Sequence, residues 1–158
     1  MKYLFLLLAA ITLMSCSKTE KKEQPFDSFV YSFSAQALDY SIKFNKSDTV
    51  YFTKRRPEPA SNSIAIITKA QKDSLIALAG RLDFSKYESV YEDKAIMDAS
   101  AFKLYKTKDG KESSVYVYGT KAPEELYRYA TQLNEFTKPL NFKPYNGTTP
   151  DFGNMGKN

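Results

Sequence analysis

The sequence has no histidine and no tryptophan, and it has a single cysteine, Cys16, among its 158 residues. Without histidine there can be no Ser-His or Cys-His nucleophile system, no histidine general base and no histidine zinc ligand. One cysteine allows no disulfide within the chain, so the fold has to rest on its own core. We therefore expect no cofactor and no metal site, and a protein that binds rather than one that catalyses a reaction.

Long apolar runs are also missing. The longest run, from Tyr3 to Met14, has twelve residues, whereas a membrane-spanning helix needs roughly 17–25 residues. A basic residue before this run, Lys2, and a small residue after it, Ser15, are typical of a secretory signal peptide. The first fifteen residues are therefore predicted to be a signal peptide that is cleaved.

The segment Leu13-Met14-Ser15-Cys16 resembles the lipobox of bacterial lipoproteins, with an aliphatic residue three positions before the cysteine and a small residue directly before it. The resemblance implies that the Cys16 sulfur carries a diacylglyceryl group and that the new amino terminus is acylated. The thiolate is the nucleophile suited to forming this thioether, and two or three acyl chains make a stable anchor. The alternative is a plain secretory signal with an accidental cysteine. We expect the membrane to be the first partner, through the lipid on Cys16.

The residues after Cys16 indicate a location by the same resemblance. Ser17 stands where an aspartate is associated with inner-membrane retention in enterobacterial lipoproteins, and no run of consecutive acids follows. We expect an outer-membrane lipoprotein that faces the periplasm. The net charge of +5 falls to +4 when Lys2 is removed, and such a modest charge does not argue for binding to nucleic acid.

Hydrophobic patterning divides the chain into a signal peptide (1–15), a lipidated cysteine with a flexible polar tether (16–26), one globular domain (27–142) and a disordered tail (143–158). Alternation of apolar and polar residues predicts strands over 28–34, 38–44 and 49–53, then a charged loop over 54–63 and a short strand over 64–67. Residues 102–107 and 113–119 are predicted to form a hairpin whose three-residue loop is Lys108-Asp109-Gly110.

Two amphipathic helices complete the pattern. Thr68 followed by Gln71 predicts a capping box before the first helix, and Pro123 with two glutamates marks the start of the second, which Pro139 ends. Residues 83–100 between the first helix and the hairpin are predicted to be irregular. The order β-β-β-(β)-α-β-β-α predicts an α+β fold: a two-layer sandwich of a mostly antiparallel sheet with both helices on one face.

The tyrosine-bearing hairpin LDYSIKFNKSDTVYF, followed by helix, hairpin and helix over about residues 27–140, is similar to small domains of unknown function in lipoproteins of the Bacteroidetes. Such domains often carry a glycine, a cysteine and a proline before that hairpin, where this chain has Ser34-Ala35-Gln36-Ala37. The resemblance implies no established activity.

Four tyrosines fall opposite the more apolar faces of the predicted strands: Tyr51, Tyr105, Tyr116 and Tyr118. Interleaved with lysines, they would form an aromatic, mildly basic binding platform on the outer face of the sheet. The alternative is that tyrosine simply suits solvated strands. The cluster Lys54-Arg55-Arg56 would contact an anion such as a lipid head group, although a solvated loop is the favoured interpretation.

Acidic residues gather after the first helix: Glu88, Glu92, Asp93 and Asp98. A hydrolase of envelope glycans or peptides would need two of them, for example Asp93 and Asp98, about 5–9.5 Å apart in a cleft. Their spacing lacks a regular calcium-binding pattern, and a solvated loop is the favoured interpretation. The leading hypothesis is therefore a membrane-anchored, non-enzymatic envelope lipoprotein that binds an envelope protein or polymer.

Overall fold

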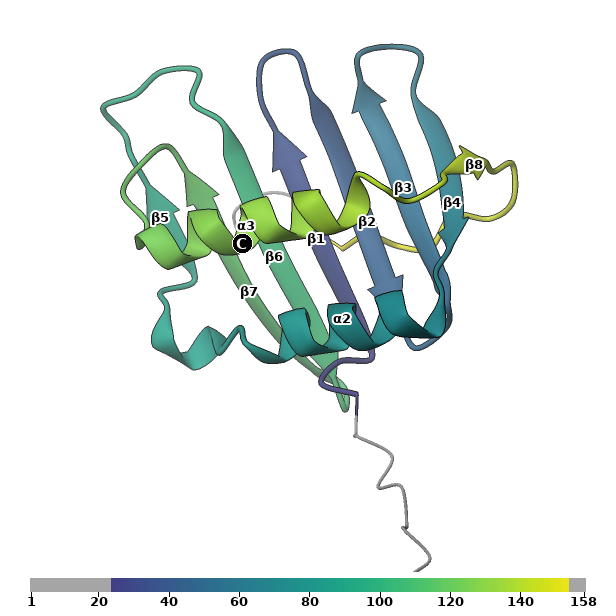
Figure 1. Ribbon diagram of the computed structural model, residues 1–158. Coiled ribbons are helices and arrows are strands. Elements are labelled where there is room, and N and C mark those ends of the chain that lie inside the picture. Colours follow the sequence, from purple (N-terminus) through teal and green to yellow (C-terminus); the bar gives the residue numbers. More distant parts are fainter. Residues whose placement is uncertain (1–23, 154–158) are drawn as a thin grey trace, which may run out of the picture.

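A computed structural model describes residues 24–153 of the protein, and Cys16, its lipobox and most of the predicted tether lie outside the described residues. One mixed sheet has the strand order β5-β7-β6-β1-β2-β3-β4-β8 (Figure 1). The elements are β1 (Ser28–Ser34), β2 (Asp39–Asn45), β3 (Thr49–Arg56), β4 (Ser61–Ile66), α2 (Lys69–Gly80), η1 (Phe84–Lys86), β5 (Val90–Glu92), β6 (Ala101–Lys108), β7 (Lys111–Tyr118), α3 (Glu124–Thr137) and β8 (Lys143–Pro144). The predicted α+β class with a mostly antiparallel sheet is confirmed.

Strand β1 is the central strand, because it pairs antiparallel with β2 on one side and with β6 on the other over its whole length. Successive side chains point to opposite faces of a strand. Phe29 and Tyr31 are therefore buried in the hydrophobic core, while Ser32 lies on the other face and is hydrogen-bonded to Ser41 of β2 at 2.7 Å.

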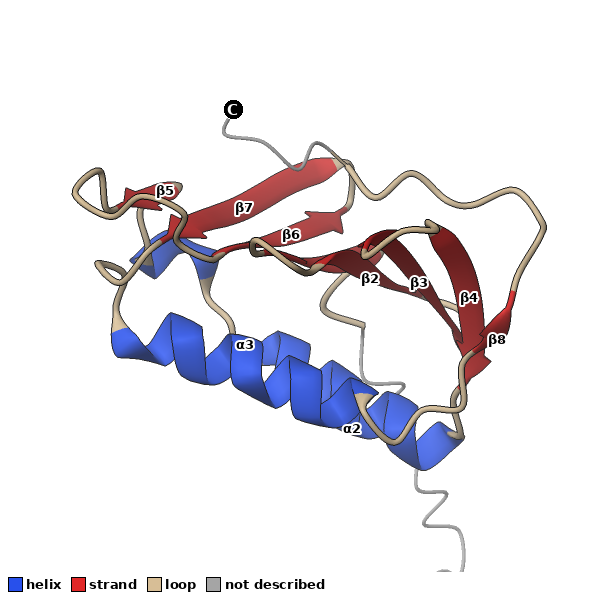
Figure 2. Ribbon diagram, turned by 90° about the horizontal axis from the view of Figure 1, so that it is seen from above, coloured by secondary structure: helices blue, strands red, loops and turns tan. Residues whose placement is uncertain are grey.

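Figure 2 shows α2 and α3 on the same side of the sheet. We call this side the inner face and the opposite side the outer face. The predicted capping box is present: the Gln71 N–H donates to Thr68 Oγ1 and the Thr68 N–H donates to Gln71 Oε1. Helix α3 packs its aromatic side chains on the sheet, with Tyr129 edge-on to Phe29 at 6.3 Å between ring centroids.

Several local predictions differ from the structure. The predicted three-residue loop is a two-residue turn, because Lys108 pairs with Lys111, and Asp109 (φ 51°) and Gly110 (φ 73°) take the left-handed conformation of such turns. Within the predicted loop 54–63, β3 continues to Arg56 and β4 already begins at Ser61. The predicted irregular region holds β5, which pairs parallel to β7.

Residues 143–158 were predicted to be a disordered tail, but residues 143–153 of this segment are ordered against the sheet. Residues Lys143–Pro144 pair with β4 as strand β8, and the Tyr145 N–H donates to the Asn62 carbonyl at 2.9 Å. From there the chain crosses the outer face of the sheet (Figure 2). We call residues 145–153 the strap. Its anchoring contacts are long-range, so local composition could not predict them.

No helix among residues 24–153 combines the length and the apolar character that crossing a bilayer requires.

A partly buried hydrogen-bond network ties α3 to the sheet. The Tyr40 hydroxyl donates to Asn134 Oδ1 at 2.9 Å, and Asn134 Nδ2 donates to the Tyr31 hydroxyl at 3.1 Å. The Tyr129 hydroxyl, in contrast, is buried without a partner among the described residues. Desolvation by burial raises the pKa of both Tyr31 and Tyr129 well above its usual range.

Two Tyr→Phe substitutions should therefore have different effects on stability. Tyr40→Phe leaves Asn134 Oδ1 without its donor and is expected to lower the free energy of unfolding by about 1–3 kcal/mol. Tyr129→Phe removes a hydroxyl that has no partner and is expected to leave the free energy of unfolding unchanged or to raise it. Urea denaturation at neutral pH measures both values. An equal loss in the two variants would contradict this interpretation of the network.

Candidate functional site

The register of the strands arranges the outward side chains in rows across the sheet. One row contains Thr53, Ser41, Ser32, Lys103 and Tyr116. The next row contains Arg56, Asp39, Ser34, Ala101 and Tyr118. Both rows belong to the outer face, because the alternate residues of the same strands are buried in the core.

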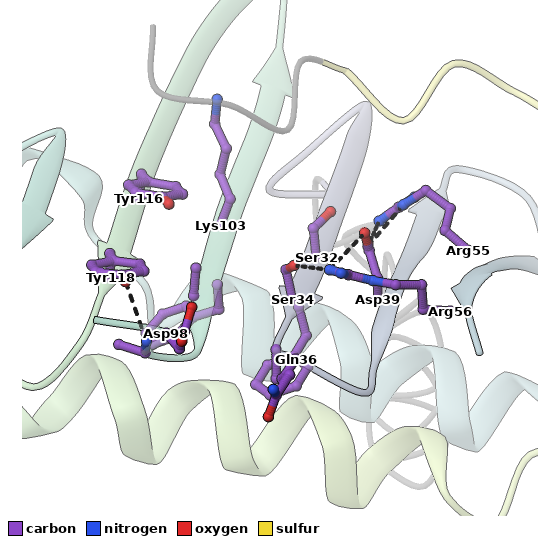
Figure 3. Close-up of a pocket in the computed structure, with 15 residues that line it drawn as sticks. Ser32, Ser34, Gln36, Asp39, Arg55, Arg56, Asp98, Lys103, Tyr116 and Tyr118 are labelled. Carbon is purple, nitrogen blue, oxygen red and sulfur yellow. Dashed lines mark hydrogen bonds and ion pairs between the residues drawn. The ribbon is translucent and has the colours of Figure 1, made fainter. Parts of the chain in front are cut away.

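The second row and part of the first, namely Ser32, Lys103 and Tyr116, line a pocket of about 510 Å³, which we call the outer-face pocket. The β1–β2 loop adds Ala35 and Gln36 to its lining, and the segment before β6 adds Asp98 and Ala99. Figure 3 shows the arginines on one wall and the two tyrosines with Lys103 on the other. A pocket of this volume lies within the range of small-molecule binding sites, roughly 300–1,000 Å³.

The arginine wall is organised around one carboxylate, Asp39. Arg55 approaches Asp39 Oδ1 with Nη2 at 2.6 Å and Nε at 2.8 Å, and Arg55 Nη2 also donates to Ser41 Oγ at 3.0 Å. Arg56 Nη2 donates to Ser34 Oγ at 3.1 Å and lies 3.7 Å from Asp39 Oδ2. A register shift between Asp39 and Tyr40 brings both arginines to the same carboxylate, since a bulge interrupts the alternation of the strand.

The tyrosine wall is held by backbone contacts. The Tyr118 hydroxyl accepts a hydrogen bond from the Ala99 N–H and donates one to the Ile96 carbonyl, both at 3.2 Å. Asp98 lies between these two residues in the left-handed conformation, with φ 59°. The chain therefore turns sharply around the Tyr118 hydroxyl, and this turn fixes the ring at the pocket.

Lys103 of β6 pairs with Tyr116 on the tyrosine wall and is only 4% exposed. Burial lowers the pKa of its ammonium group, and the charge of Glu112 opposes this shift. A lysine in such surroundings favours an anionic neighbour. The pocket lining as a whole contains three cationic side chains, Arg55, Arg56 and Lys103, and two carboxylates, Asp39 and Asp98.

The four predicted tyrosines all lie on the outer face, but they do not form a continuous platform. Tyr116 and Tyr118 line the outer-face pocket. Tyr51 packs edge-on against Tyr145 of the strap at 6.0 Å. Tyr105 lies beneath Gly153, where an added Cβ would be 3.5 Å from its ring, and desolvation with a hydrogen bond to Glu112 raises its pKa to about 12. The strap thus contacts two of the four rings.

The predicted basic cluster is divided between two surroundings. Arg55 and Arg56 line the pocket, whereas Lys54 pairs with Tyr40 at the edge of the register shift and is not among the pocket residues. The cluster belongs to strand β3 and not to a loop. That both arginines line the pocket could not be predicted, because strict alternation would place two adjacent residues on opposite faces of the sheet.

The two carboxylates of the hydrolase hypothesis have different environments. Asp98 lines the pocket, whereas Asp93 does not. Asp93 is 6% exposed and binds Lys121 Nζ at 3.0 Å, the Ala95 N–H at 3.2 Å and Thr120 Oγ1 at 3.4 Å. Gly119 also packs closely against Asp93, because a Cβ added at Gly119 would lie only 2.7 Å from Asp93 Cβ. Asp93 therefore serves as a structural acceptor that holds two loops together.

The described residues contain no group of three or more histidine, cysteine, aspartate or glutamate side chains that could hold a metal ion. Comparisons of the chain with models of protein families, with curated proteins and with solved structures give no match.

Sequence reasoning missed Asp39, Ser34 and Ser41 as residues of the site. Their outward direction was predictable, because Asp39 and Ser41 alternate with apolar residues along β2. Their role was not predictable, because it depends on a bulge that brings two arginines of the next strand to one carboxylate.

The Asp93 ion pair gives a pH-dependent prediction for stability. The hydrogen bond from Lys121 lowers the pKa of Asp93 from its ordinary value of 3.8. A carboxyl group with a lowered pKa in the folded state stabilises the fold above its unfolded pKa, and this contribution is lost as the pH falls through the folded pKa. Asp93→Asn should therefore lower the Tm at pH 7, and the difference from the unsubstituted protein should shrink below about pH 4.

The matched control for this prediction is Asp73→Asn. Asp73 forms an exposed ion pair with Lys69 on α2, and exposed pairs contribute little to stability. Thermal unfolding followed by circular dichroism from pH 3 to pH 8 measures both variants. A Tm difference for Asp93→Asn that does not depend on pH would show that the carboxylate charge is not responsible.

Proposed function

We propose that this protein is a lipid-anchored envelope lipoprotein whose folded domain binds an envelope protein or polymer on the outer face of its sheet. One observation carries the proposal: Tyr116, Tyr118, Arg55 and Arg56 converge on the outer-face pocket. Figure 2 shows both helices on the inner face of the sheet, and we infer a two-layer α+β sandwich whose helices do not cover this pocket. Clefts with aromatic walls and a few fixed polar groups are typical ligand sites.

The contacts within the pocket support binding rather than simple strand packing. A tyrosine that only filled a solvated strand would not need its hydroxyl held by two backbone groups, as Tyr118 has. Likewise, Arg56 is fixed by Ser34 although its side chain remains 48% exposed. Side chains that are held in place before a ligand arrives lose less conformational entropy on binding.

The competing hypothesis, a hydrolase of envelope glycans or peptides, has less support from this geometry. Asp98 is available in the pocket, but Asp93 forms an ion pair with Lys121 and is not part of the lining. A carboxylate held in this way has a lowered pKa, which does not suit a general acid at neutral pH. We therefore retain a non-enzymatic binding domain as the proposed function.

The anchor and the location are proposed from the sequence. The lipobox Leu13-Met14-Ser15-Cys16 supports lipid attachment at Cys16 and cleavage of residues 1–15. Ser17 and the absence of a run of acids after Cys16 support an outer-membrane lipoprotein that faces the periplasm.

Cys16→Ser should abolish lipid attachment. A hydroxyl does not replace the thiolate as the acceptor of the diacylglyceryl group, so labelling with radioactive palmitate and recovery in the membrane fraction should both be lost. Ser17→Ala keeps the cysteine and serves as the control, with labelling expected to be unchanged. Persistent labelling of Cys16→Ser would show that the lipobox interpretation is wrong.

The binding function is tested with a photo-crosslinking residue in the full-length protein in its own cells. Gln36 is exposed at the rim of the pocket, so a crosslinker in its place should form adducts with an envelope protein or polymer. The same crosslinker in place of Lys69, which is exposed on α2, is the control and should form none. Tyr118→Ala should remove at least about nine-tenths of the adducts at position 36, in keeping with an aromatic anchor.

Two outcomes of this crosslinking experiment would contradict the proposed function. One is the absence of adducts from position 36, and the other is an equal yield of adducts from positions 36 and 69. Immunoblots and mass spectrometry of the adducts distinguish a protein partner from a polymer.

A further inference from the structure

We propose that the outer-face pocket binds a saccharide that carries a carboxylate group, with Arg56 holding the carboxylate and Tyr118 packing against the sugar ring. This inference rests on the proposed binding function and names its class of ligand. Three features of the pocket favour such a ligand: Arg56 has donors to spare, Arg55 neutralises Asp39, and Asp98 lies beside Tyr118 (Figure 3).

Arg56 is fixed at one end of its guanidinium group and open at the other. Only its Nη2 contacts Ser34 Oγ and Asp39 Oδ2, and its remaining N–H groups contact no acceptor within residues 24–153. A guanidinium presents its donors in a planar fork that matches the two oxygens of a carboxylate. Because Arg56 is half exposed and already oriented, it suits this kind of bidentate contact.

Asp39 does not cancel the charge of Arg56. Arg55 is the closer partner of Asp39, with two contacts shorter than 2.9 Å to Oδ1, while Arg56 lies 3.7 Å from Oδ2. The Asp39–Arg55 pair is therefore neutral as a unit, and the positive charge of Arg56 is left to attract a ligand. Lys103 also belongs to the lining, but burial disfavours its charged form, so Arg56 is the principal positive group.

The opposite wall favours a sugar over a compact polyanion. Tyr118 uses its hydroxyl for two backbone contacts, so its ring is what it offers to a ligand, and an aromatic ring packs well against the apolar face of a pyranose. Asp98 beside it can accept hydrogen bonds from sugar hydroxyls. A polyphosphate head group carries several negative charges and would be repelled by Asp98, which lines the same pocket, more strongly than a single carboxylate would be.

The test uses two matched probes with the mature protein in detergent: a galacturonic acid tetramer and the neutral tetramer made by reducing its carboxyl groups. Isothermal titration calorimetry should give a Kd at least about tenfold lower for the acidic tetramer. Arg56→Gln should remove this preference, a loss of roughly tenfold to hundredfold in affinity for the acidic tetramer alone. Tyr118→Leu should weaken binding of both tetramers.

The chain offers a matched charge control two positions away. Lys54→Gln also removes one positive charge from β3, but Lys54 is not part of the pocket lining, so the preference for the acidic tetramer should be retained. Arg56→Lys keeps the charge and removes the fork, so it should recover only part of the lost affinity. Thermal unfolding of each variant verifies that it is folded.

Three outcomes would overturn this inference: no binding of either tetramer, equal affinity for both, or a loss in Lys54→Gln as large as that in Arg56→Gln. Crosslinking from position 36 separates this failure from that of the proposed function. If adducts sensitive to Tyr118→Ala still form, the binding function stands and only the saccharide class is wrong. If those adducts are absent as well, both proposals fail.

Discussion

The double pairing of β1 is the constraint on which the rest of the structure depends. Every residue of β1 has a partner on β2 and another on β6, so one register fixes the directions of side chains on three strands. A slip of one residue would move Phe29 and Tyr31 from the core to the outer face and turn Ser28 and Ser32 toward the core. The aromatic core under α3 excludes that slip. The register that remains places the polar residues in rows on the outer face.

The outer face then has two parts with different surroundings. The strap crosses the row that contains Tyr51 and Tyr105, which it contacts through Tyr145 and Gly153. The rows beyond it form the outer-face pocket. A uniformly polar outer face, with no strap and no pocket, would offer a ligand no preferred place to bind. Here the strap, the bulge at Asp39 and the turn around the Tyr118 hydroxyl gather the pocket-lining groups at one end of the sheet.

Much of this fold was predictable because its signals are local. Alternation over 28–34 predicted β1 with its observed bounds, and Thr68 with Gln71 predicted the capping box that begins α2. The outward direction of Tyr116 and Tyr118 follows from the same alternation. The bulge beside Tyr40, the parallel pairing of β5 and the strap depend on contacts between residues far apart in the chain. Local pattern carries no signal for such contacts, so Arg55 and Arg56 could be listed as a cluster but not assigned to a pocket.

The direction of β1 has a mechanical consequence for the proposed attachment of the protein to a membrane through Cys16. The described chain enters the sheet beside Ser28, and β1 runs from there to Ser34 at the pocket (Figure 1). Its seven residues span about 20 Å, so the pocket lies at the end of the sheet far from the point of attachment. Tension between a bilayer and a bound, immobile polymer would act along β1. Its hydrogen bonds to β2 and β6 would then bear the load together in shear, and would not break one after another as in unzipping.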